Sequence, residues 1–148
     1  MTEQEYRSRL TALNQAKIHH WDPVMDGGKP LLDRLTSDML AVPCSLTERQ
    51  QANALLVIFR LRGWGNQHTL ASVLESASQS KTLEVRDQAA ILAAGLVRLS
   101  REESHKNEQI NVSPLLDLLR CVLLRGVSSN TATLINPLLP DRPDSPQP

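Results

Sequence analysis

Two stretches of this 148-residue chain, residues 48–61 and 85–98, align with each other without a gap, and this internal repeat limits the possible folds more than any other feature. The matched positions are Arg49 with Arg86, Gln51 with Gln88, Ala52 with Ala89, Leu55 with Leu92, and Phe59 with Leu96. Apolar residues recur every three or four positions in both stretches, which is the spacing of one face of an α-helix. A shorter apolar stretch precedes each one, at residues 30–35 and 69–74, and residues 114–119 repeat the first of these almost letter for letter. Helix pairs that recur about every 37 residues are typical of a stacked helical-repeat fold.

The second long stretch resembles the HEAT-type helical repeats. Their second helix often carries a Val-Arg-x-x-Ala-Ala pattern, here Val85, Arg86, Ala89 and Ala90. The resemblance covers residues 30–100 and extends loosely over 114–139; the first repeat departs from it with Glu48 in place of the valine. It implies an all-α fold, a small right-handed stack of antiparallel helix pairs with units at about 30–65, 66–100 and 114–139. A compact bundle of about six to seven helices stays open as the alternative.

Composition agrees with an all-α fold, because leucine and alanine dominate the apolar residues and only 3% of the residues are aromatic. Residues 1–28 are expected to form an N-terminal helix, over 2–18, and a loop. Residues 29–139 form the helical-repeat domain, in which Ser45 and Glu48 have the spacing of a capping box at the start of a helix. Five of the nine prolines lie in residues 137–148, so we expect residues 140–148 to be a disordered tail.

The charge balance limits the classes of partner. Sixteen basic residues face sixteen acidic ones, which argues against a general binder of nucleic acid. Neither a membrane-spanning stretch nor a secretory signal is present in the sequence, so we expect a cytoplasmic protein that does not bind membranes. Cys44 and Cys121 form neither a CxxC pair nor a disulfide framework, and we interpret both as reduced, buried residues.

The sequence offers little chemistry for catalysis. His19, His20, Asp22 and Asp26 are the one cluster of metal-ligand residue types, but adjacent histidines point in different directions and seldom bind the same ion. His68 and His105 stand alone. No phosphate-binding glycine loop and no nucleophile motif occurs. We therefore expect a protein that is not an enzyme and has no metal, cofactor or catalytic residue, with a minor enzyme hypothesis resting on His19, His20 and Asp22.

Four arginines occupy corresponding ends of the two long predicted helices: Arg60, Arg62, Arg98 and Arg101, here called the arginine edge. Cations at helix C-termini complement the helix dipole without any ligand, but stacked repeats would also bring them together for an acidic partner or a phosphate backbone. Trp64 lies between two glycines and is either an interface anchor or a cap on the core. These five residues are the candidate partner-binding site.

The segment from Leu115 to Leu124 is apolar around most of its circumference, whereas a terminal repeat needs a polar outer face. Its cover is expected to come from Leu134, Ile135, Leu138 and Leu139, or from a second copy of the chain in a homo-oligomer.

Together these features predict a non-catalytic protein–protein interaction module, such as an adaptor, chaperone or assembly or regulatory factor. It would bind a helix or an extended segment of another protein on a rigid helical surface. The alternative is a helical regulatory or nucleic-acid-binding protein that uses the arginine edge. Phosphate contacts weaken steeply with salt and apolar contacts do not, which separates the two.

Overall fold

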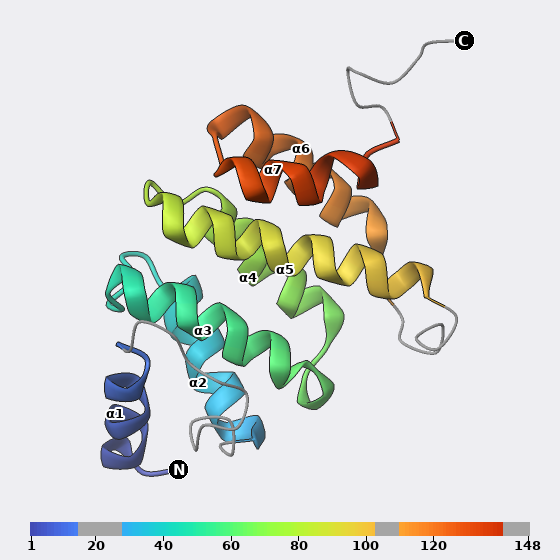
Figure 1. The fold of residues 1–148 in the computed structure, drawn as a ribbon. Helices are drawn as coiled ribbons and strands as arrows, with labels where there is room; N and C mark the ends of the chain where they lie inside the picture. Colours follow the sequence, from blue (N-terminus) through green and yellow to red (C-terminus); the bar gives the residue numbers. More distant parts are fainter. Residues whose placement is uncertain (15–27, 103–109, 141–148) are drawn as a thin grey trace, which may run out of the picture.

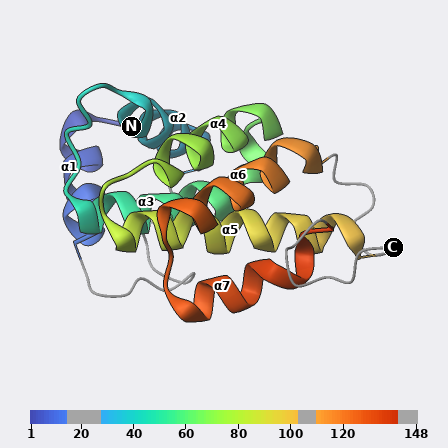
Figure 2. The ribbon, with the colours of Figure 1, turned by 90° about the horizontal axis from the view of Figure 1, so that it is seen from above.

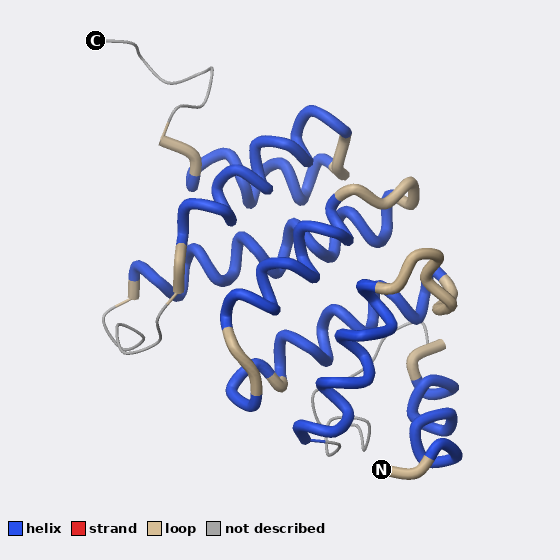
Figure 3. The backbone as a smooth tube through the Cα atoms, turned by 180° about the vertical axis from the view of Figure 1, so that it is seen from behind, coloured by secondary structure: helices blue, strands red, loops and turns tan. Residues whose placement is uncertain are grey.

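The computed structural model describes residues 1–14, 28–102 and 110–140, and in these ranges the chain forms α helices and short 3-10 turns without a strand. Figure 3 shows the same composition along the backbone, helix joined by loop. The all-α prediction is confirmed. The elements are α1 (Glu3–Ala12), α2 (Gly28–Leu40), α3 (Glu48–Arg60), η2 (Arg62–Trp64), α4 (Gln67–Ser78), α5 (Leu83–Arg101), α6 (Val112–Arg125), α7 (Ser129–Ile135) and η4 (Asn136–Leu138).

The helices from α2 to α7 are arranged in two layers. Helices α2, α4 and α6 form one layer, and α3, α5 and α7 form the other, with each helix antiparallel to the one before it (Figures 1 and 2). Helix α5 is central, since it packs against α3, α4, α6 and α7. Because α3 and α5 run side by side in the same direction, their C-terminal ends meet at one end of the stack.

The core between the layers is aliphatic. Helix α5 alone buries eight residues in it: Val85, Ala89, Ala90, Leu92, Ala93, Ala94, Leu96 and Val97. Half of these are alanines, whose small side chains let neighbouring helices approach closely. Of the described aromatic residues, Tyr6 is buried, Phe59 is half-buried and Trp64 is exposed.

The start of α3 differs from the sequence prediction. The capping box is formed by Thr47 and Gln50, whose side chains bond each other's backbone N–H groups, and not by Ser45 and Glu48. A start at Thr47 leaves Leu46 outside the helix, where its side chain turns into the core and is 6% exposed. Burial of this leucine therefore determines which of two adjacent capping patterns forms.

Helix α1 packs on the first helix pair. Its buried Tyr6 donates a hydrogen bond to Asp38 of α2, and the guanidinium of Arg34 lies 4.1 Å from the centre of the Tyr6 ring. Arg34 also pairs with Glu3 of α1 at 3.0 Å. The helix ends at Ala12, and the rest of the stretch predicted to be helical, from residue 15 onward, lies outside the described residues.

Helix α6 is covered by helices that precede it. Leu115, Leu118, Leu119 and Val122 are buried, and α6 packs against α4 and α5. Ile135 of α7, Leu138 of η4 and the following Leu139 are also buried. Both α7 and η4 pack on α5. Of the apolar residues in 115–124, Leu124 is left 89% exposed. The helix stops at Gly126, whose φ of 113° suits glycine.

Candidate interaction surface at the ends of α3 and α5

The structure places the arginine edge at neighbouring helix ends. Arg60 is the last residue of α3, Arg62 begins η2, and Arg98 and Arg101 lie in the last turn of α5. The parallel course of α3 and α5 puts these ends on the same side of the stack (Figure 1). The sequence at each helix end determines the position of each arginine along its helix. The packing of α3 against α5 then brings the four arginines to the same side of the stack.

Two of the four arginines are held by the fold. The guanidinium of Arg62 stacks over the Phe59 ring at 4.4 Å and donates from Nη1 to the Phe59 carbonyl oxygen at 3.1 Å. Arg101 donates from Nη2 to the Leu138 carbonyl oxygen at 3.1 Å, which ties the end of α5 to η4. Both contacts cap carbonyl groups near helix ends, as expected for cations at these positions.

The other two arginines face solvent. Arg60 and Arg98 are exposed, and neither forms an ion pair with another residue in the described part of the chain. A partner could therefore pair with these two charges without breaking an ion pair to any residue that the structure describes.

Trp64 follows Arg60 and Arg62 in the chain and is 61% exposed. It is the last residue of η2, which turns the chain from α3 toward α4. The side chain does not belong to the buried core, so its interpretation as a cap on the core is wrong. An indole held outside the fold on a short, hydrogen-bonded turn has the exposure that an interface anchor needs.

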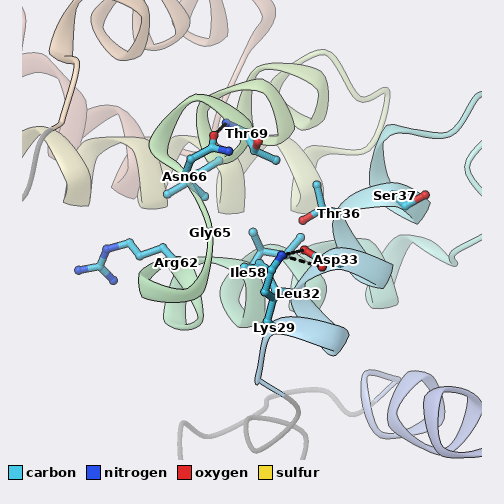
Figure 4. A pocket seen from close by; sticks show the side chains of 11 residues that line it. Lys29, Leu32, Asp33, Thr36, Ser37, Ile58, Arg62, Gly65, Asn66 and Thr69 are labelled. Carbon is cyan, nitrogen blue, oxygen red and sulfur yellow. Dashed lines mark hydrogen bonds and ion pairs between the residues drawn. The ribbon is translucent and has the colours of Figure 1, made fainter. Parts of the chain in front are cut away.

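Three hollows lie along the first turn of α4. The first has a volume of about 250 Å³ and lies between α2 and α4, with apolar walls from Leu32, Ile58 and Leu70. At its rim Lys29 Nζ pairs with Asp33 at 2.9 Å (Figure 4). A Cβ atom on Gly65 would lie 2.9 Å from Leu32 Cδ2, so the backbone at residue 65 approaches α2 more closely than a larger residue would allow.

The other two hollows follow the same line. The second, of about 370 Å³, is lined by Arg60, Arg62, Gly63 and Gln67. The third, of about 110 Å³, lies between α4 and α6, and its walls include Ala71, Leu96 and Leu115. Sequence reasoning found the arginines of this surface but missed the hollows, because their walls come from separate helices that only tertiary packing brings together.

The hydroxyl of Thr36 is an exception to the general satisfaction of buried polar groups. Its Oγ1 atom is buried and has no hydrogen-bond partner among the described residues, and the side chain lies at the wall of the first hollow (Figure 4). A buried hydroxyl without a partner destabilises the folded state by about 1–3 kcal/mol.

The metal-ligand cluster predicted from sequence, His19, His20, Asp22 and Asp26, lies outside the described residues, as does His105. Elsewhere in the described ranges no group of three or more His, Cys, Asp or Glu side chains is placed to hold a metal ion. His68 is exposed at the third hollow. The prediction that both cysteines are buried is wrong: Cys121 is exposed and Cys44 half-buried, and neither is in a disulfide.

Among the described residues, the one group with a strongly shifted pKa is Tyr6, which lines none of the three hollows. Burial, and then the hydrogen bond to Asp38, raise the pKa of Tyr6 well above its ordinary value of 10.0. The phenol stays neutral and joins α1 to α2, which is a structural role.

Comparisons with protein-family models, with curated proteins and with solved structures found no match for this chain. Among the helices of the described residues, none is long and apolar enough to cross a membrane.

Proposed function

We propose that the protein is a non-catalytic interaction module, an adaptor, chaperone or assembly factor, that binds an acidic segment of another protein at the arginine edge. The observation that carries the proposal is the exposed Trp64, four residues after Arg60 and on the same side of the stack as Arg98, because neither arginine has an ion pair to another described residue. Tryptophan and arginine are the residue types most enriched at interface hot spots. The internal repeat and the layered helix pairs further support a HEAT-like scaffold, which presents such a surface rigidly.

Charge favours an acidic partner. The edge carries four arginines, and Glu102, the acidic residue that follows Arg101, is already engaged in an interaction. Guanidinium groups pair with carboxylates through two parallel hydrogen bonds, a geometry that lysine does not offer. Arg62 and Arg101 are already oriented by their carbonyl contacts, so fewer side-chain rotations have to be lost on binding.

The test begins with affinity capture from the native host, identification of the bound protein by mass spectrometry, and binding measurements with that protein in purified form. Trp64→Ala and Arg98→Glu should each weaken binding at least about tenfold, because each removes a central contact. Arg125→Glu is the matched control, since Arg125 is also an exposed arginine in the last turn of a helix but lies at the opposite end of the stack. It should bind as the wild type does.

Thermal unfolding of the same variants completes the test. Trp64→Ala should melt within a few degrees of the wild type, because substitutions of exposed residues change stability by about 0.5 kcal/mol or less. Equal binding by Trp64→Ala, Arg98→Glu and wild type would contradict the proposal. Capture that is lost after nuclease treatment, with a steep salt dependence, would instead support nucleic acid as the ligand of the arginine edge.

A further inference from the structure

The three hollows along α4 form one continuous row. Arg62 lines both the first and the second hollow, and Gln67 lines both the second and the third. The row therefore begins at α2, passes the arginines at the end of α3, and ends at α6. A single ligand that follows it would touch the first turn of α4 throughout.

The chemistry of the row alternates. Its two outer hollows have aliphatic walls, from Leu32, Ile58 and Leu70 at α2 and from Leu96 and Leu115 at α6. The central hollow is lined by Arg60 and Arg62 and has no acidic residue. In Figure 4 the Arg62 side chain extends away from Leu32 and Lys29, so its guanidinium lies outside the first hollow.

We infer that this row binds an extended segment of the partner in which two apolar side chains flank an acidic one. The inference rests on the proposed function and specifies the form of its ligand. The charge of the central hollow favours the acidic residue in the middle, and the aliphatic walls of the outer hollows favour the apolar residues at both ends.

The geometry also sets the spacing. Neighbouring packed helices lie about 8–10 Å apart, so the first and third hollows, on the two sides of α4, are about one such spacing apart in a straight line and farther apart along the path past the arginines. An extended chain advances about 3.3 Å per residue and points alternate side chains to opposite faces. The two apolar residues therefore stand four positions apart, about 13 Å, and the acidic residue midway between them faces the arginines.

A synthetic pentapeptide with this pattern tests the inference. The probe is blocked, fluorescently labelled Leu-Ser-Glu-Ser-Leu, and its binding is followed by fluorescence anisotropy. The matched control is Leu-Glu-Ser-Ser-Leu, which has the same composition and charge but turns its glutamate to the opposite face. We expect the control to bind at least about tenfold more weakly, a difference of about 1.4 kcal/mol.

Substitutions in the protein locate the site. Ser37→Trp fills the first hollow from its exposed side, and Ala71→Met fills the third. Each substitution should weaken binding of the probe about tenfold. Ser76→Trp should leave the binding unchanged, because Ser76 is an exposed residue of α4 that lines none of the three hollows. Replacing either terminal leucine of the probe by alanine provides a second readout that does not depend on the folding of a variant.

Equal binding of the two pentapeptides, or binding of the probe by Ser37→Trp and Ala71→Met as tight as by the wild type, would overturn the inference. The proposed function has a separate outcome. If the probe fails while Trp64→Ala and Arg98→Glu still abolish binding of the captured partner, the row is not the ligand site and the interaction module stands. If those two substitutions also leave binding of the captured partner unchanged, both the inference and the proposed function are wrong.

Discussion

Arg86 of α5 donates from Nε to the carbonyl oxygen of Gly126, 3.0 Å away, and so joins the second helix pair to the loop between α6 and α7. Its Nη1 atom donates to the carbonyl oxygens of Ser80 and Lys81, also at 3.0 Å. Arg49, the aligned residue of the first repeat, pairs with Glu84 of α5 at 3.0 Å. The same position of the internal repeat thus reaches forward to the next unit twice, once to the half-buried carbonyl of Gly126 and once to the exposed carboxylate of Glu84.

The two arginines should contribute unequally to stability. Arg86→Met removes charged hydrogen bonds to three carbonyls and should lower the free energy of unfolding by about 2–3 kcal/mol. Arg49→Met removes an ion pair between side chains that are 40% and 43% exposed, and should cost less than about 1 kcal/mol. Urea denaturation of both variants measures the difference. Equal losses would show that the Arg86 contacts do not stabilise the stack.

The Thr36 hydroxyl gives a prediction of opposite sign. Thr36→Val replaces a buried hydroxyl that has no described partner with a methyl group of the same shape, and should raise the free energy of unfolding by about 1 kcal/mol. The control is Thr131→Val, because Thr131 is also buried but its hydroxyl bonds Ser128 Oγ at 2.9 Å. That substitution should cost about 1 kcal/mol. A loss of stability in Thr36→Val would mean that its hydroxyl makes a stabilising bond.

The raised pKa of Tyr6 predicts that the free energy of unfolding falls at alkaline pH. Its pKa is raised in the folded state, so the folded state favours the neutral phenol, and this contribution is fully present below pH 10.0 and is lost as the pH rises above it. Wild-type stability should therefore fall more steeply above this pH than that of Tyr6→Phe. Tyr6 is the single tyrosine of the chain, so the absorbance of tyrosinate reports its ionisation directly. Ionisation near pH 10.0 with α1 still docked would contradict the buried hydrogen bond to Asp38.

The start of α3 is testable through its cap. Thr47→Ala removes the side chain that accepts from the Gln50 N–H, and should lower the free energy of unfolding by about 1 kcal/mol. Ser45→Ala, at the position expected from the sequence pattern, should change it by less than about 0.5 kcal/mol. Chemical denaturation of the two variants decides between the two capping boxes, and a larger loss in Ser45→Ala would favour the sequence-based one.

Much of the fold follows from the sequence because helix periodicity is local. The spacing of Val85, Ala89, Leu92 and Leu96 predicts α5, and Gly126 predicts the end of α6. Helix boundaries are less predictable, since the choice between Ser45 and Thr47 depends on the burial of Leu46 by distant residues. The packing of α6 is hard to predict for a related reason, because its apolar residues pack on α4 and α5 of the preceding unit.

The candidate site was predictable only in part. The arginine edge follows from repeat alignment, because equivalent positions of parallel helices end at the same side of the stack. The hollows depend on how α2, α4 and α6 pack, and no local pattern reports that packing. Gly65 was the available signal, since a glycine after a helix end often marks a close approach of the backbone, here to Leu32.

The fluorescence of Trp64 tests the central claim most directly. A Trp21→Phe substitution leaves Trp64 as the single tryptophan, which can be titrated with the purified partner. Because the indole is 61% exposed before binding, we predict that a partner seated on the arginine edge will shift its emission to shorter wavelength and reduce quenching by acrylamide about severalfold. Unchanged emission and quenching at saturating partner would show that binding occurs elsewhere and would contradict the account.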